Sequence, residues 1–281
     1  MAINPTLEEK PAGGGNPTAG RAINGLHFPT AKQPGKAFDH GLALHPADPT
    51  KQFRAAILAA GLALAPSAGA QVPPTASEIA AYRGLHAAAA RGDVAALQRL
   101  LAAQPGPGTL NARDAHGRTP LHVATFARQR EAVRLLAQAG AALDLLENDR
   151  YDAVTIAAVA DDEDTLRLLL QLGASAKQVT SRYDGTALIA AAHLGHAGVV
   201  RQLIAAGAPL DHVNNLHWTA LIESIVLGDG GARHQATLQA LLEAGASTQL
   251  ADRHGNTPLQ LARQRGYTAM VKMLEAAGAR P

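Results

Sequence analysis

The chain has 281 residues, and its 25 Lys and Arg against 23 Asp and Glu give a formal charge of only +2 at pH 7. A surface this close to charge balance gives no reason to expect nucleic-acid binding, and the absence of cysteine excludes disulfides, thiolate zinc sites and cysteine nucleophiles. Hydrophobic residues reach 47% while aromatic residues make up only 3%, a composition that favours closely packed, alanine-rich helices over a sandwich or barrel.

Residues 1–50 show no sustained helical or strand periodicity. Three consecutive glycines at positions 13–15 and prolines such as Pro29, Pro34 and Pro46 interrupt them repeatedly. We expect this stretch to be a disordered extension, or to precede the true translation start.

Residues 51–70 have the three parts of a secretory signal peptide. Lys51 and Arg54 supply the basic start, residues 55–65 form an apolar core of eleven residues, and Ala68 and Ala70 complete an A-x-A cleavage site. We expect cleavage between residues 70 and 71, which places the mature chain, residues 71–281, in the periplasm or outside the cell. A buried alanine-rich helix of the fold is the alternative. No apolar run of about 18 residues indicates a membrane span.

From about Ser77 onward the sequence repeats with a period close to 33 residues. Gly-Ala pairs mark the period, and successive pairs are 33, 34, 38 and 33 residues apart. Each pair follows an apolar helical segment, and a second short apolar segment lies further upstream. The pattern predicts units of two helices each. The pairs begin at Gly140, Gly173, Gly207, Gly245 and Gly278.

The segments Asp114–His122 (DAHGRTPLH) and Asp252–Leu259 (DRHGNTPL) closely resemble the ankyrin-repeat motif. The resemblance implies an all-α solenoid of helix-turn-helix units connected by β-hairpin loops. Thr119 and Thr257 are predicted to cap the first helix of their units, with proline at the first helical position. A single unit cannot bury its apolar face, so we expect the array to be stable only as a stack.

We count about six units, including the two caps of the stack. The first is irregular, with helices predicted over Leu85–Gly92 and Val94–Leu101. A later unit is about five residues longer than its neighbours, because of an insertion within Gly228–His234. Together with Trp218–Leu227, this insertion resembles a small group of bacterial ankyrin proteins of the YahD-like type. That resemblance implies a fold and no particular activity.

The hairpin loops are predicted to form a row of tips along one edge of the stack, and we expect the binding residues there. Three of the six aromatic residues from Tyr82 onward fall in these loops. Rigid, exposed aromatic side chains are common anchors of protein interfaces, although packing over a neighbouring loop is the structural alternative. The predicted binding residues are Arg118, Tyr151, Arg182, Tyr183, Trp218, Arg253 and His254, with Phe126 on the adjoining inner surface.

No catalytic, metal-binding or cofactor-binding motif is complete in the sequence. His193 and His196 have the i, i+3 spacing of metal ligands, but no third ligand is identifiable. His86 and His122 are expected to form hydrogen bonds within the stack. The acidic run at residues 161–164 is predicted to cap a helix rather than to bind calcium.

We therefore predict an exported, non-enzymatic monomer that binds a protein partner through its hairpin tips and concave surface, without a cofactor. Two alternatives stay open. Resemblance to exported bacterial ankyrins implies an accessory factor that protects or matures one exported enzyme, such as a catalase active in oxidative stress. The other alternative is a small metal-dependent hydrolase that uses His193, His196 and a nearby acid.

Overall fold

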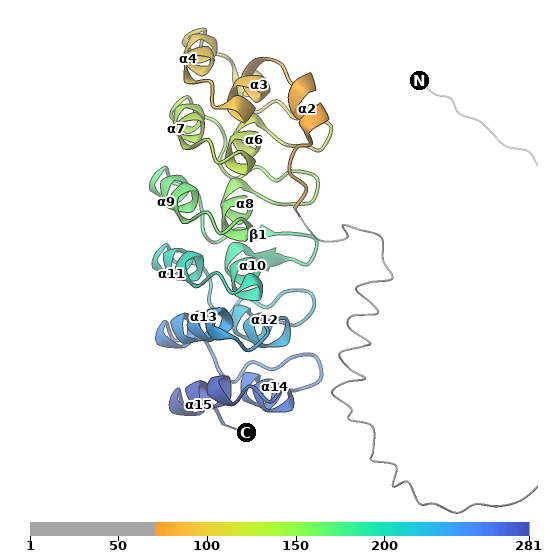
Figure 1. The fold of residues 1–281 in the computed structure, drawn as a ribbon, viewed down its shortest axis with the longest axis vertical. Coiled ribbons are helices and arrows are strands. Elements are labelled where there is room, and N and C mark those ends of the chain that lie inside the picture. The colour runs from red at the N-terminus through yellow and green to blue at the C-terminus, as the bar shows by residue number, and fades with distance from the viewer. Residues whose placement is uncertain (1–70, 281) are drawn as a thin grey trace, which may run out of the picture. The chain divides into compact units, whose positions relative to one another are not determined.

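The computed structural model describes residues 71–280. The predicted extension (residues 1–50) and the predicted signal peptide (residues 51–70) lie outside these described residues. From residue 71 onward the structure is a stack of helix pairs (Figure 1), which confirms the predicted ankyrin-repeat solenoid.

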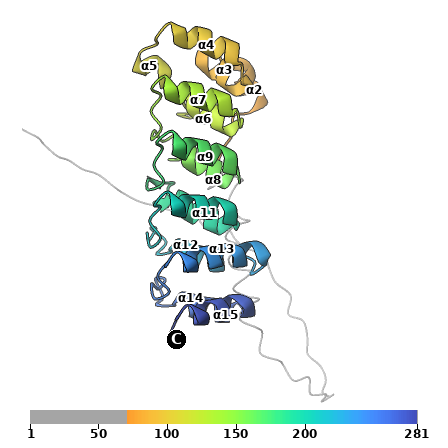
Figure 2. The ribbon, with the colours of Figure 1, turned by 90° about the vertical axis from the view of Figure 1, so that its left-hand side faces the viewer.

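Each pair consists of an inner helix, next to the loops, and an outer helix on the opposite side of the stack (Figures 1 and 2). The inner helices are α3 (Gly84–Arg91), α6 (Pro120–Phe126), α8 (Ala153–Val159), α10 (Ala187–Leu194), α12 (Ala220–Val226) and α14 (Pro258–Gln264). The outer helices are α4 (Val94–Ala102), α7 (Arg130–Gln138), α9 (Glu163–Gln171), α11 (Ala197–Ala205), α13 (Ala232–Glu243) and α15 (Thr268–Ala276). Helix α2 (Ala76–Ala81) precedes the stack, and the short α5 (Pro107–Leu110) connects the first two units.

A side-chain oxygen caps most inner helices at the residue before the first turn. Thr119 and Thr257 are the caps of α6 and α14, with proline at the first helical position, as the sequence predicts. Asp152 takes the same role at α8. Each cap satisfies a backbone N–H group that the helix cannot pair internally, so the start of each inner helix is set locally.

The loops between units are tight turns rather than extended hairpins. Among the described residues the only paired strands are β1 (Val179–Thr180) and β2 (Gly185–Thr186), which run antiparallel. In the other four loops, the N–H of the first loop residue donates to the carbonyl of the fifth at 3.0 Å. These bonds join Asp114 to Arg118, Glu147 to Tyr151, Asn214 to Trp218 and Asp252 to Asn256.

Backbone hydrogen bonds also connect loops of neighbouring units. The N–H of Asn148 donates to the carbonyl of His116 at 3.0 Å, and the N–H of Asn215 donates to the carbonyl of Tyr183 at 2.9 Å. The N–H of Ser181 also donates to the carbonyl of Arg150 at 2.8 Å, so backbone bonds join the first four loops into one ordered edge.

The core lies between successive helix pairs. Each outer helix has at least one fully buried leucine, and the inner helices present small residues such as Ala124 and Ala191 that allow the units to approach closely. No described helix is long and apolar enough to cross a membrane. The buried outer-helix leucines are Leu97, Leu136, Leu169, Leu203, Leu241 and Leu274.

The predicted insertion, residues 228–234, spans the turn after α12 and the first residues of α13, and it contacts both neighbouring units. The hydroxyl of Tyr267 donates to the carbonyl of Gly228 at 2.9 Å, on the following unit's side. On the preceding unit's side, Nε2 of His234 donates to the carbonyl of His193 at 2.9 Å. The structure gives these residues a bracing role between neighbouring units.

Candidate functional site

Position within a loop determines whether a side chain reaches solvent. We number the five loop residues from the first, which is Asp114, Glu147, Ser181, Asn214 or Asp252. The first side chain accepts backbone N–H groups of its own loop: Oδ1 of Asp114 accepts from His116 at 2.9 Å and from Arg118 at 2.8 Å. The bond from the fifth N–H recurs in the other four loops, and the fifth residue is buried or partly buried in every loop.

The expectation that Arg118, Tyr151 and Trp218 form exposed tips is wrong in its geometry. All three occupy the fifth loop position. Arg118 is 0% exposed and Tyr151 is 8% exposed, while Trp218 is partly buried against the core. Tyr183, at the third loop position, is 39% exposed and is the one predicted aromatic that lies on the surface as expected.

Arg118 instead anchors the N-terminal segment to the first loop. Its Nε donates to Oδ2 of Asp114 at 2.7 Å, and its Nη2 donates to Oε1 of Glu78, in α2, at 2.5 Å. Its Nη1 reaches the carbonyl of Val72 at 3.2 Å. Hydrogen bonds from Thr75, followed by Arg118, hold the pKa of Glu78 at about 2, so this acid stays ionised and paired.

Arg182, Tyr183, Arg253 and His254 are exposed at the loop edge, and we call these four residues the tip surface. Nη2 of Arg182 donates to Oδ1 of Asp149 in the preceding loop at 2.6 Å. Nη2 of Arg253 lies 3.4 Å from the carbonyl of Asn215, also in the preceding loop. Each arginine side chain therefore contacts the loop of the preceding unit.

The inner helices add a second surface, which we call the inner face and which includes Phe126, His193 and Glu223. Phe126 is half-buried on α6, and His193 is exposed on α10. Glu223 on α12 is only 5% exposed, and burial raises its pKa to about 7 against the opposing hydrogen bond from Asn214.

Glu223 was not among the predicted site residues, although the sequence carries a signal for it. It is the fourth residue after the helix cap, a position that is aliphatic in the other four aligned units. An acid in a column of aliphatic residues contradicts a purely packing role. The equivalents are Val123, Ile156, Ala190 and Leu261.

Several other histidines have structural partners, as predicted for His86 and His122. Nε2 of His122 donates to the carbonyl of Leu145 at 2.9 Å, and Nε2 of His86 donates to the carbonyl of Arg118 at 3.0 Å. Nδ1 of His196 lies 2.9 Å from the carbonyl of Ala158. Within residues 71–280, no three His, Asp or Glu side chains come together as a metal-binding group.

The acidic run caps α9, as predicted. Oδ1 of Asp162 accepts from the N–H of Thr165 at 3.2 Å, and its Oδ2 accepts from the Thr165 hydroxyl at 2.7 Å. Nη2 of Arg130 also donates to Oδ1 of Asp162 at 3.0 Å, which adds a contact between units.

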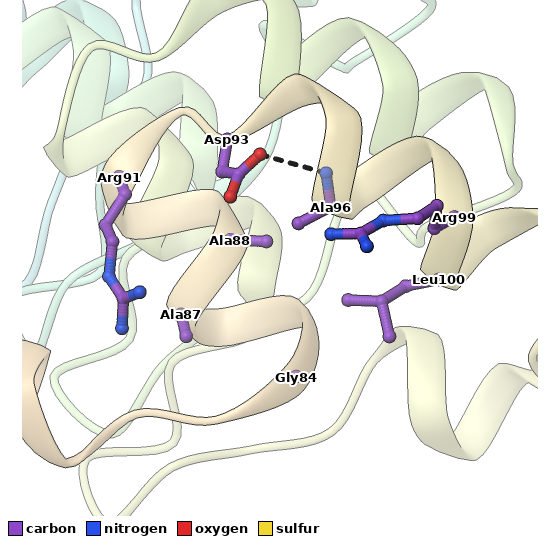
Figure 3. A pocket seen from close by; sticks show the side chains of 8 residues that line it. All are labelled: Gly84, Ala87, Ala88, Arg91, Asp93, Ala96, Arg99 and Leu100. Carbon is purple, nitrogen blue, oxygen red and sulfur yellow. Dashed lines mark hydrogen bonds between the residues drawn. The ribbon is translucent and has the colours of Figure 1, made fainter.

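A hollow of about 440 Å³ lies on the first unit, between α3 and α4 (Figure 3). Asp93 is its one acid, and Oδ1 of Asp93 accepts from the N–H of Ala96 at 2.9 Å as a helix cap. Figure 3 draws no hydrogen bond between Asp93 and the two arginines of the lining, Arg91 and Arg99. We assign no chemistry to this hollow, whose lining is Gly84, Ala87, Ala88, Arg91, Asp93, Ala96, Arg99 and Leu100.

Comparison with known families identifies the repeats. The model for ankyrin repeats (3 copies) matches residues 85–182 and 154–252, and the model for a single ankyrin repeat matches residues 254–281. The ankyrin repeat protein YahD of Escherichia coli K12 is 36% identical over 193 residues, which cover 68% of this chain and 94% of that protein.

Two solved structures extend the comparison. An ankyrin repeat domain from Acinetobacter baumannii is 44% identical with a TM-score of 0.65, over 70% of this chain and 98% of that one. A complex of a predatory endopeptidase of Bdellovibrio bacteriovorus with an immunity protein matches with 25% identity and a TM-score of 0.55. That match covers 69% of this chain and 98% of the other.

Proposed function

The chain belongs to the ankyrin-repeat family, and we propose that it is a non-enzymatic scaffold that binds a protein partner through the tip surface and the inner face. The observation that carries the proposal is the order of the loop edge. Hydrogen bonds close each loop and join neighbouring loops, so little conformational entropy is lost when a partner docks.

The chemistry of the tip surface favours a partner with acidic and aromatic groups. Arg182 and Arg253 offer planar guanidinium groups, which suit bidentate pairing with carboxylates. Tyr183, between them in the chain, offers a rigid aromatic side chain of the kind that anchors interfaces. Trp218 in the fourth loop and Phe126 on the inner face are both partly buried, and we expect them to widen the contact.

A pair of matched double variants tests the role of the tip surface. We expect Tyr183→Ala with Arg253→Ala to weaken binding of the natural partner, captured by cross-linking with the mature protein, by at least about tenfold. The control is Arg134→Ala with Arg167→Ala, which removes two exposed arginines from the outer helices α7 and α9. Equal binding by both double variants would show that the tip surface is not the interface.

We further propose that the protein is exported and that cleavage after residue 70 releases the mature form. The three-part pattern of residues 51–70 supports this, and Val72, whose carbonyl accepts from Arg118, would stay in the mature chain. N-terminal sequencing of exported material should find Gln71 or its cyclised form. A folded product in the cytosol that retains residues 1–50 would contradict export.

An accessory factor for one exported enzyme is a second candidate, and one comparison favours it. The similar Bdellovibrio structure contains an endopeptidase together with an immunity protein. If this protein acts in a comparable way, its captured partner is an enzyme whose activity or lifetime changes when the two are mixed. A partner without any enzymatic activity would argue against this candidate and leave the scaffold role in place.

A further inference from the structure

Glu223 is a nearly buried carboxyl group at the corner where α12 meets its loop. Its Oε1 accepts a hydrogen bond from Nδ2 of Asn214, the first residue of that loop, at 2.9 Å. Its Oε2 lies 3.7 Å from Nδ1 of His193 on the neighbouring helix α10, beyond hydrogen-bonding distance. One carboxylate oxygen is therefore held, and the other faces the inner face with no hydrogen-bond partner among the described residues.

The orientation of Asn214 is set by its own loop. Its Oδ1 accepts from the N–H groups of Leu216 and Trp218, both at 3.0 Å, so its amide nitrogen must point away from the loop and toward Glu223. In two other loops the same position is an aspartate, Asp114 or Asp252, whose second oxygen would repel a carboxylate. An asparagine at position 214 can therefore donate a hydrogen bond to Glu223, which an aspartate there could not do.

A packing role does not account for this pair. Burial of a carboxyl group with one hydrogen bond costs stability, and an aliphatic residue at this position would avoid that cost. The aligned units carry aliphatic residues there and form the same helix pairs. The side chain of Glu223 keeps 7% exposure, and that of the adjacent His193 keeps 47%, so the surface is open beside the acid.

We propose that Glu223, oriented by Asn214 and flanked by His193, is an anchor on the inner face for a lysine or arginine side chain of the protein partner. A cation at Oε2 would supply the missing partner, and its pairing in a largely desolvated corner would be stronger than at an exposed rim. Burial lowers the pKa of His193, which disfavours an imidazolium beside the acid, and a bound cation would hold Glu223, whose own pKa burial raises to about 7, in its ionised form. A lone carboxylate suits one basic side chain rather than a metal ion, which takes several ligands.

This anchor rests on the proposed scaffold function, and its test is independent of the tip surface. A random peptide library is selected against the wild-type chain, against Glu223→Gln, and against Glu243→Gln. Glutamine keeps the shape of Glu223 and an oxygen that accepts from Asn214, but it removes the charge. Glu243 is an exposed acid on α13, so its replacement is the matched control.

We expect wild-type selections to enrich peptides with a lysine or arginine at one fixed position. Those peptides should bind Glu223→Gln at least about tenfold more weakly and Glu243→Gln unchanged, with all three proteins melting cooperatively. Equal binding to Glu223→Gln, enrichment without a fixed basic position, or no enrichment at all would overturn the anchor. None of those results bears on the tip-surface variants, which report on the scaffold function separately.

Discussion

Burial shifts the pKa values of two titratable residues of the inner helices in opposite directions. It lowers the pKa of His122 to about 4 and raises the pKa of Glu223 to about 7, because in each case it disfavours the charged form. His122 is satisfied on both ring nitrogens: Nδ1 accepts from the N–H of Thr119 at 3.1 Å, and Nε2 donates to Leu145. The histidine is thus a neutral structural link, whereas Glu223 retains an oxygen for a partner.

Because burial lowers the pKa of His122, the free energy of unfolding depends on pH. Above pH 6.5 its imidazole is neutral in both the folded and the unfolded chain. As the pH falls from 6.5 to about 4, only the unfolded chain takes up the proton, so the free energy of unfolding decreases, by about 3 kcal/mol at completion.

Replacement of His122 by glutamine should remove this dependence and keep the helix cap. Gln260 caps α14 in the equivalent way, with its Oε1 accepting from the N–H of Thr257 at 2.9 Å. Urea unfolding of both proteins at several pH values measures the effect, and titration of Glu223 cancels in the difference. A difference in unfolding free energy between the two proteins that does not change from pH 7 to pH 4 would contradict the buried neutral state.

At the scale of elements, the repeats themselves explain how much could be predicted. Helix pairs, threonine caps and loop ends recur in several units, so aligned positions reinforce one another in the sequence. The burial of Arg118 depends on α2, which precedes the repeats and has no counterpart to align. Glu223, by contrast, stands out from the sequence alone once the units are aligned, because the equivalent positions, such as Val123 and Ile156, are aliphatic.

The docking of α2 on the first loop should depend on Arg118. We expect Arg118→Ala to lower the unfolding free energy by about 3–5 kcal/mol, because Glu78 and Asp114 would lose the cation between them. The control Arg253→Ala removes an exposed arginine and should change stability by no more than about 0.5 kcal/mol.

Hydrogen exchange of the amides in residues 76–81 locates the effect of Arg118→Ala. Protection there should fall in Arg118→Ala while protection in α10 and α12 is retained, since distant units share no contacts with this cluster. Unchanged protection in α2 would show that other contacts hold the segment.

At the scale of the described stack, stability is a sum of contacts between neighbouring units. Helix α9 packs against α7 on one side and α11 on the other, while α15 has α13 as its outer-helix neighbour and ends the stack. Bracing across units by His234 and Tyr267 adds polar contacts at the insertion. Such an architecture presents a long surface that no single unit could hold in place alone.

Two leucines with the same burial but different neighbours test this architecture. Leu169 in α9 and Leu274 in α15 are both 0% exposed. We expect Leu169→Ala to lower the unfolding free energy by about 2–5 kcal/mol, the range for large-to-small changes in a core. Leu274→Ala should cost less, because α15 has one outer-helix neighbour in the described stack and α9 has two. Urea unfolding followed by circular dichroism measures both costs, and equal costs would contradict a stack governed by nearest neighbours.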